Sequence, residues 1–262
     1  MRFTIDGRTA FAGTGTGRAG TDAPTVVFVH GAAMDHTVWV LPSRYFARQG
    51  YRVLAFDLPG HGRSEGPPLG SVEAMSDWLD AACGVLDVES AAIVGHSMGS
   101  LVAYRFAVDH PERCRALGLL GTSVPMPVTS VLLDAAADDD HAAIEMTNAW
   151  SHSPRGTLGG NRNPGVWMMA AGERLIERSA PGVLHADLAA CNGFDPAAIT
   201  RTVDVPALVI AGDADRMTPA RAGLDVARAL PDARIVRLDG CGHAMLNERP
   251  NEILDALIGI CR

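Results

Sequence analysis

The sequence predicts an α/β fold: a mostly parallel, doubly wound sheet of about eight strands with helices on both faces. Short apolar runs alternate with helix-forming segments along most of the chain. A G-x-S-x-G motif at residues 95–99 stands between one such run and a helical segment, and an acid and a histidine each follow a later strand. The carboxyl ends of parallel strands share one edge of a sheet, where catalytic groups gather.

Each expected strand is a short apolar run, and each expected helix is a longer stretch of helix formers. Strands are expected at residues 3–6, 9–13, 25–30, 52–56, 91–96, 115–120, 205–211 and 234–238. Helices are expected at residues 38–49, 71–86, 98–109, 218–229 and 248–260. The first two strands should pair antiparallel through a turn at Gly7, at one edge of the sheet.

The motif at residues 95–99 predicts a nucleophile. An apolar run precedes it and helix formers follow it, so Ser97 should lie at a tight turn between strand and helix. The glycines two positions before and after the serine leave room for a close crossing of strand and helix. The same five-residue pattern also occurs by chance, so the expectation depends on this context and on finding the serine's partners.

Two further motifs support this interpretation. Residues 26–31 read as a strand followed by a His-Gly turn, and residues 57–64 read D-x-x-G-x-G-x-S. With these motifs, the chain resembles the α/β-hydrolase family over about residues 1–120 and 200–262. The resemblance implies a core domain of residues 1–121 and 201–262, with residues 122–200 inserted as a helical cap or lid.

The resemblance also implies the catalytic residues. Ser97 would be the nucleophile, His243 the general base, and Asp215 the acid that orients the histidine. Asp213 is the alternative acid. The family usually places its acid three residues after the glycine that ends the strand, here Gly212, which favours Asp215.

The backbone N–H groups of Met98 and Ala32 are expected to form the oxyanion hole. Met98 should lie at a helix N-terminus, where an N–H group stabilises developing negative charge. Ala33 is the alternative to Ala32. His30 is expected to brace this loop rather than to transfer protons.

Substrate choice should depend on residues 122–200. Helical stretches are expected there at residues 131–137, 142–150 and 166–180, with a loop at residues 153–161. The side chains expected to line the pocket are His36, Met146, Trp150, Trp167 and His185. Further candidates are Trp39, His152, Arg162, Asn163, Met168 and Met169. The apolar members have an alternative role, which is to hold the cap on the core.

Composition excludes several functional classes. The 262 residues are 47% hydrophobic and carry a net charge of −8, so we expect a folded protein and no nucleic-acid partner. No apolar run suits a signal peptide or a membrane span, so we expect no membrane partner and a cytoplasmic protein. The five cysteines are scattered, which favours free thiols; Cys241, two residues before His243, is a candidate pocket residue.

Cofactor and metal chemistry are not expected. All 22 cationic residues are arginine, and without a lysine there is no Schiff base, pyridoxal phosphate linkage or P-loop lysine. The G-x-G-x-x-G at residues 15–20 is followed by a strand instead of a helix, so we interpret it as a turn. The nine histidines lack metal-ligand spacing, and the acidic cluster at residues 138–141 is expected to be solvated.

The expected reaction is hydrolysis of a small carboxylic ester or lactone through an acyl-enzyme intermediate. One alternative is carbon–carbon bond hydrolysis of ring-cleavage diketones. The resemblance implies a Gly-His-Trp motif at the histidine of enzymes of that class, whereas this chain has Ala244 after His243. A second is a ligand receptor with a hydrolase fold and low turnover. Ser97 excludes haloalkane dehalogenases and epoxide hydrolases, which have aspartate at that position. The expected partner is the small-molecule substrate, and the sequence does not predict an oligomeric state.

Overall fold

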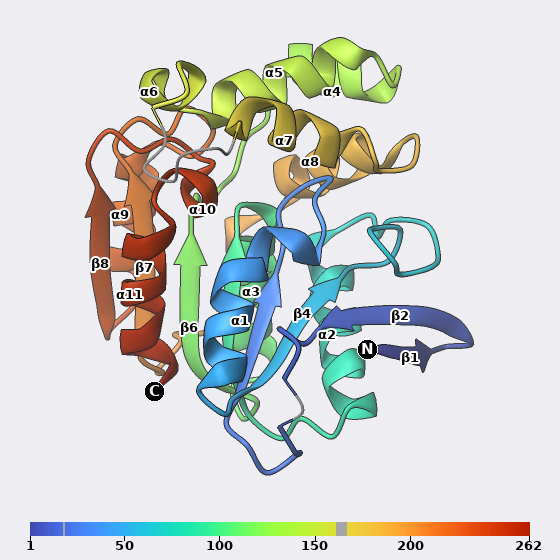
Figure 1. The fold of residues 1–262 in the computed structure, drawn as a ribbon, viewed down its shortest axis with the longest axis vertical. Coiled ribbons are helices and arrows are strands. Elements are labelled where there is room, and N and C mark those ends of the chain that lie inside the picture. Colours follow the sequence, from blue (N-terminus) through green and yellow to red (C-terminus); the bar gives the residue numbers. More distant parts are fainter. Residues whose placement is uncertain (18, 161–166) are drawn as a thin grey trace.

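The computed structural model describes residues 1–17, 19–160 and 167–262, and these form one eight-stranded sheet with helices on both faces (Figure 1). The strands are β1 (Arg2–Ile5), β2 (Arg8–Gly13), β3 (Thr25–Val29), β4 (Arg52–Asp57), β5 (Ala91–His96), β6 (Cys114–Leu120), β7 (Ala207–Gly212) and β8 (Ala233–Leu238). Their order in the sheet is β1-β2-β4-β3-β5-β6-β7-β8. The predicted fold class is therefore confirmed.

The pairing of the strands also follows the prediction. β1 and β2 form an antiparallel hairpin at one edge, and β2 pairs antiparallel with β4. The strands from β4 to β8 pair in parallel. The hairpin turns at Gly7, whose φ of +77° lies in the left-handed region that glycine adopts without steric cost.

Helices from the two ends of the chain cover the sheet. They are η1 (His36–Trp39), α1 (Val40–Arg48), α2 (Val72–Val85), α3 (Met98–Asp109), α9 (Ala220–Arg228), α10 (Met245–Glu248) and α11 (Pro250–Cys261). In β3, Val27 and Val29 pack into the cluster of α2, α3 and α9, whereas Val26 and Phe28 pack with α1 and α11. Because successive residues point to opposite faces, a strand that is apolar throughout fits a sheet covered on both sides.

Between β6, which ends at Leu120, and β7, which begins at Ala207, the chain contributes several helices; residues 122–200 are called the helical insertion below. Its helices are α4 (Ser130–Ala137), α5 (His141–Ser151), α6 (Pro154–Thr157), α7 (Met168–Ile176), α8 (Val183–Gly193) and η2 (Pro196–Ala198). Figure 1 shows α4 to α8 above the end of the sheet to which β6 points. The insertion has an apolar cluster of its own, with Leu132, Ile176 and Leu188, which also takes in Ala33 of the core.

Two predictions about the insertion were wrong. The segment expected to be a loop contains α6, because Pro154 opens a helical turn and the Ser153 hydroxyl accepts a hydrogen bond from the Gly156 N–H at 3.0 Å. Helix α8 was not expected. It begins after Gly182 without a side-chain cap, so the sequence carries no start signal there.

Among the described residues, every helix is too short or too polar to cross a lipid bilayer.

Candidate active site

Ser97 lies between the last residue of β5 and the first residue of α3, in strained backbone. Its φ of 55° and ψ of −123° fall outside the regions that residues with a side chain normally adopt. Neighbouring groups hold it there: its N–H donates to the Leu120 carbonyl at 2.9 Å, and its carbonyl accepts from the N–H and hydroxyl of Ser100. The strained turn presents the serine at the end of the sheet, where it lines a cavity.

Two glycines allow this turn. A Cβ on Gly95 would lie 1.9 Å from the Gly99 carbonyl oxygen, and a Cβ on Gly99 would lie 2.3 Å from that of Val29. Both distances are far shorter than any van der Waals contact, and the obstructing atoms belong to the backbone. Helix α3 therefore crosses the sheet at a distance that only glycine permits.

Substitution of Gly99 would disturb the close crossing of α3 and the sheet. Gly99→Ala should lower the free energy of unfolding by at least about 3 kcal/mol, because the methyl group must displace backbone in two elements. Chemical denaturation monitored by circular dichroism measures the change. The matched control is Gly84→Ala in α2, where a Cβ meets nothing within 4 Å. That variant should be unchanged or more stable by up to about 1 kcal/mol. Equal stability of the two variants would contradict the expectation.

The loops after β7 and β8 bring Asp215 and His243 together. The Nδ1 of His243 lies 2.8 Å from Oδ2 of Asp215, and both residues are buried. A carboxylate only accepts, so the imidazole donates from Nδ1 and has its Nε2 free to accept a proton. Burial raises the pKa of Asp215, but the interaction with His243 and the hydrogen bonds from Thr218 outweigh it. The pKa therefore lies below its usual value.

Thr218, which was not singled out from the sequence, holds the Asp215 carboxylate. Oδ1 accepts from the N–H groups of Met217 at 2.9 Å and Thr218 at 2.8 Å, and Oδ2 accepts from the Thr218 hydroxyl at 2.9 Å. The aspartate thus forms a turn with its own backbone. The spacing Asp-x-x-Thr was the signal that could have identified Thr218.

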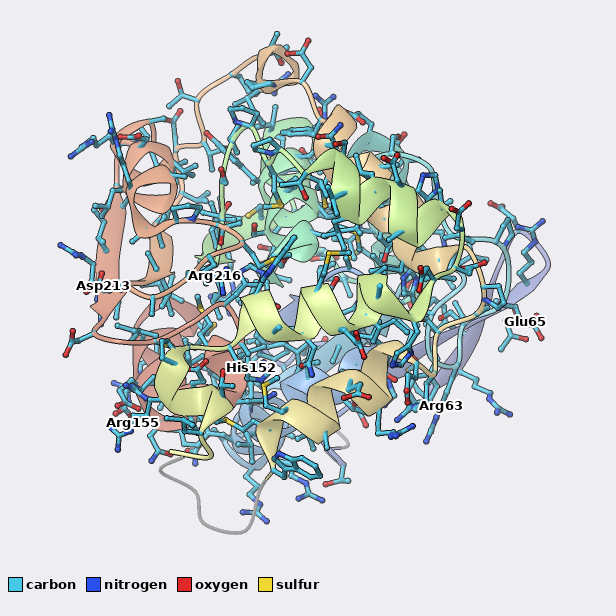
Figure 2. The ribbon with its side chains drawn as sticks, turned by 90° about the horizontal axis from the view of Figure 1, so that it is seen from above. Arg63, Glu65, His152, Arg155, Asp213 and Arg216 are labelled. Carbon is cyan, nitrogen blue, oxygen red and sulfur yellow. The ribbon has the colours of Figure 1, made fainter. Side chains whose placement is uncertain are left out.

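The alternative acid, Asp213, faces the opposite way. Its carboxylate is paired with the guanidinium of Arg237 at 2.8 Å, and the residue is exposed. Figure 2 shows it at the periphery of the molecule. The geometry therefore associates His243 with Asp215 rather than with Asp213.

The N–H groups expected to bind an oxyanion differ in what they contact. Met98 is the first residue of α3, where N–H groups have no partner within the helix. Ala32 lines the same cavity as Ser97. The N–H of Ala33, the alternative to Ala32, donates to Oδ2 of Asp187 at 2.8 Å. Since that donor is already engaged, the geometry favours Ala32.

Asp187 of α8 also ties the helical insertion to the core. The same Oδ2 lies 2.8 Å from Nε2 of His61, whose Nδ1 lies 3.0 Å from the Pro59 carbonyl oxygen. Both ring nitrogens face acceptors, so the buried imidazole donates from both. Burial lowers the pKa of His61, but the carboxylate of Asp187 more than offsets it, and the pKa is raised. A buried ion pair therefore fixes the loop that carries Ala32 and Ala33.

Removing this anchor should destabilise the protein. Asp187→Ala leaves the His61 imidazolium and the Ala33 N–H buried without an acceptor, so the free energy of unfolding should fall by about 3 kcal/mol. Urea denaturation measures it. Asp134→Ala, an exposed carboxylate on α4, is the matched control and should change little. A loss at Asp187 no larger than the control's would refute the anchoring role.

Two buried histidines make stability depend on pH. Burial, assisted by His61, lowers the pKa of His30 from 6.5 to about 4. Burial, assisted by His243, lowers that of His96 from 6.5 to about 3. The folded chain thus binds fewer protons than the unfolded chain at mildly acidic pH. Their contribution is complete above pH 6.5 and is lost as the pH falls toward these values.

We therefore expect the free energy of unfolding to fall between pH 6.5 and 4.5, by about 1.4 kcal/mol per pH unit for each histidine that stays neutral. The raised pKa of His61 favours the folded chain as the pH falls, but this is one histidine against the two whose pKa values are lowered. Urea titrations at pH 7.5, 6.0 and 4.5 measure the change. A flat profile would show that these rings become charged in the folded chain.

Ser97 and His243 line one cavity of about 110 Å³ between the core and the helical insertion. The other core residues that line it are Ala32, Met34, Arg216, Met217 and Thr218. The insertion contributes Met126, Pro127, Val128, Thr129, Leu132, Thr147, Trp150, Ser151, Leu188 and Cys191. The wall is mostly apolar, with hydroxyl groups and one guanidinium.

Of the five side chains expected to line the pocket, Trp150 is the one that the described cavity wall includes. His36 is held by the Asp57 carboxylate, 2.8 Å from its Nδ1. Met146 packs against the insertion's own cluster, Trp167 is 71% exposed, and His185 is half-buried on α8. Helical spacing identifies the apolar residues of a helix, but it does not tell which of them face a cavity.

The further candidates also lie elsewhere. His152 is buried and lines a separate cavity of about 40 Å³ with His96. Trp39 belongs to the core, as does Cys241, whose thiol pKa is raised by burial. Met168 and Met169 are not part of the described cavity wall. Arg162 and Asn163 lie outside the described residues.

Within the described ranges, three groups of side chains have ligand atoms close enough to share a metal ion. They are Asp35 with His36 and Asp57, Asp77 with Asp109 and His110, and His141 with Glu173 and Glu177. These residues are absent from the wall of the cavity that Ser97 lines. We assign no role to them in the site.

Comparisons with known proteins agree with this architecture. The sequence profile described as "Alpha/beta hydrolase family" matches residues 26–256. The chain is 33% identical over 246 residues to the pimeloyl-[acyl-carrier protein] methyl ester esterase of Aromatoleum aromaticum, across 87% of this chain and 94% of that protein. It is 29% identical over 244 residues to a 2-hydroxy-6-oxononadienedioate/2-hydroxy-6-oxononatrienedioate hydrolase of a Pseudomonas species, across 86% and 83%.

Among solved structures, the enol-lactonase from Burkholderia xenovorans LB400 superposes with a TM-score of 0.87. The superposition covers 99% of this chain and 98% of that one, at 21% sequence identity. At this level of identity, the likeness shows a shared fold.

Proposed function

The chain belongs to the alpha/beta hydrolase family, and we propose that it is a serine hydrolase that cleaves small carboxylic esters or lactones. The observation that carries the proposal is the meeting of three features at one cavity. Ser97 stands in a strained turn, His243 lines the same cavity, and Asp215 holds the histidine in the tautomer that accepts a proton at Nε2. This combination is what acyl transfer through a serine requires.

In the proposed reaction, His243 takes the proton of Ser97 as Oγ forms a bond to the carbonyl carbon. The bond from that carbon to the leaving oxygen breaks, and His243 returns the proton to the departing alcohol. Water then attacks the acyl-enzyme, giving one proton to His243 and its oxygen to the acid. The serine regains its proton, so the histidine completes two cycles in each turnover.

The Ala32 and Met98 N–H groups are proposed to stabilise the oxyanion of each tetrahedral intermediate. In comparable sites one such donor contributes about 3 to 4 kcal/mol to the barrier reduction. The anchor at Asp187 supports this role indirectly, since it fixes the backbone immediately after Ala32.

We propose that the helical insertion, residues 122–200, acts as the cap over a core of residues 1–121 and 201–262. Ten of the residues around the cavity come from the insertion, including Leu132, Trp150 and Leu188. A cavity of about 110 Å³ is small beside the several hundred Å³ of drug-sized sites, so it suits a short acyl chain.

The cavity's size also bears on the second candidate reaction, the hydrolysis of a carbon–carbon bond. The Pseudomonas relative is named for a dicarboxylate substrate of the ring-cleavage type, 2-hydroxy-6-oxononadienedioate, and this similarity supports the second candidate. The small cavity and the presence of Ala244 after His243 favour ester hydrolysis.

Steady-state hydrolysis separates these candidates. The substrates would be p-nitrophenyl esters from acetate to octanoate, a small lactone, and a 2-hydroxy-6-oxo-dienoate ring-cleavage product. We expect multiple turnover of esters, fastest with the short acyl chains. Faster cleavage of the dienoate would favour carbon–carbon hydrolysis. A single slow turnover that retains the ligand would indicate a receptor.

A further inference from the structure

Among the described residues of the cavity wall, one side chain carries a permanent charge. Arg216 follows Asp215 directly in the chain and lines the cavity, yet it is exposed to solvent, so it lies where the cavity opens. Among the described residues of the wall, the side chains of Asp, Glu and Lys are absent, and His243 is the other residue able to become cationic. The described wall thus carries a positive side chain, although the protein as a whole has a net charge of −8.

The backbone fixes the position of this arginine. Oδ1 of Asp215 accepts hydrogen bonds from Met217 and Thr218, so the turn closes around Arg216. The same carboxylate holds His243 through Oδ2. In Figure 2, Arg216 lies between the α9 side of the core and the helical insertion, whereas Asp213 lies at the periphery. The backbone from which the guanidinium extends thus has a defined place relative to Asp215 and His243.

The guanidinium also lacks an internal anion. Some arginines of the described chain are paired with carboxylates, as Arg237 is with Asp213 and Arg178 with Asp35. For Arg216, the described residues provide neither an ion pair nor a hydrogen-bond acceptor among the acidic side chains. A bare guanidinium at the opening of an otherwise uncharged cavity can bind a carboxylate through two parallel N–H donors.

We propose that Arg216 forms a subsite for a carboxylate on the substrate, so that the preferred substrates are short esters or lactones that also carry a free carboxylate. This inference rests on the proposed function. The carboxylate can belong to the acyl chain, as in a monoester of a short dicarboxylic acid, or to the alcohol, as in an ester of glycolate. Arg216 acts as a specificity-determining residue and takes no part in the chemical step.

The test compares charged and neutral substrates of equal shape. The acyl series uses the monomethyl esters of succinate, glutarate and adipate. Each is compared with the methyl ester in which a carboxamide replaces the free carboxylate. The alcohol series uses butyryl glycolate beside butyryl glycolamide. Arg216→Gln should reduce the charged-to-neutral ratio of kcat/KM about tenfold, through KM, in one series or both. Arg216→Lys, which keeps the positive charge, should retain part of the preference.

The matched control is Arg155→Gln, which removes one positive charge from α6 of the insertion. Arg155 is exposed and is absent from the described cavity wall (Figure 2). Its substitution should leave the ratio unchanged, whereas an equal effect would show that only the general field of the protein matters and would overturn the proposal. An unchanged ratio for Arg216→Gln in both series would overturn it as well.

A binding measurement separates failure of this subsite from failure of the proposed function. If the wild type hydrolyses none of the esters, charged or neutral, the ester-hydrolase proposal fails. Calorimetric titration with glutarate, compared with glutaramide, then still tests the subsite. Weaker glutarate binding by Arg216→Gln than by the wild type supports the carboxylate site, and equal binding refutes it.

Discussion

Ser97→Ala is expected to reduce kcat for a short p-nitrophenyl ester by at least about 10⁴-fold. The strained turn at φ 55° places Ser97 at the wall of the cavity that His243 also lines, and the proposed acyl-enzyme forms on its hydroxyl. The variant should fold, because the backbone hydrogen bonds of Ser97 to Leu120 and Ser100 remain. Initial rates and thermal unfolding measure the two effects.

The control for this variant is Ser130→Ala, which removes an exposed hydroxyl at the start of α4. It should retain wild-type activity. Persistent hydrolysis by Ser97→Ala, in a preparation free of wild-type enzyme, would show that another group performs the attack.

Asp215→Asn should lower kcat by about 10³- to 10⁴-fold with a smaller effect on KM. The amide keeps the size of the carboxylate but removes the charge that stabilises the His243 imidazolium. It can also reverse the hydrogen bond at Nδ1, which puts the imidazole in the wrong tautomer. Steady-state kinetics with a short ester measures both parameters.

The matched control, Asp213→Asn, lies two residues away. It removes the exposed ion pair with Arg237 and should leave kcat within about twofold of wild type. The opposite pattern, a large loss at Asp213 and none at Asp215, would assign the acid role to Asp213.

The core could be predicted from sequence because its signals are local. Each strand from β3 to β7 is a short apolar run, and the turn at residues 95–99 carries its glycines within five positions. The acid and histidine follow strands directly, so the parallel topology alone brings them to one edge. The sequence therefore predicts that Asp215 and His243 lie near each other, and in the structure their side chains are 2.8 Å apart.

The insertion could not be predicted as well, because its contacts are distant in sequence. Asp187 contacts His61, which is 126 residues away in sequence, and Ala33, which is 154 residues away. The local sequence of α8 does not indicate either contact. Trp150 and Trp167 look alike as bulky apolar residues at helices, yet one lines the cavity and the other is 71% exposed. The packing of α4 to α8 against one another decides between them.

The most direct test of the central claim is covalent labelling with a fluorophosphonate probe, followed by peptide mass spectrometry. A serine activated by His243 and Asp215 should react once, on the peptide that contains Ser97, and heat-denatured protein should not react. We expect this single adduct, its loss in Ser97→Ala and a parallel loss of ester hydrolysis. An adduct on another residue, or ester hydrolysis that continues after Ser97 is fully labelled, would contradict it.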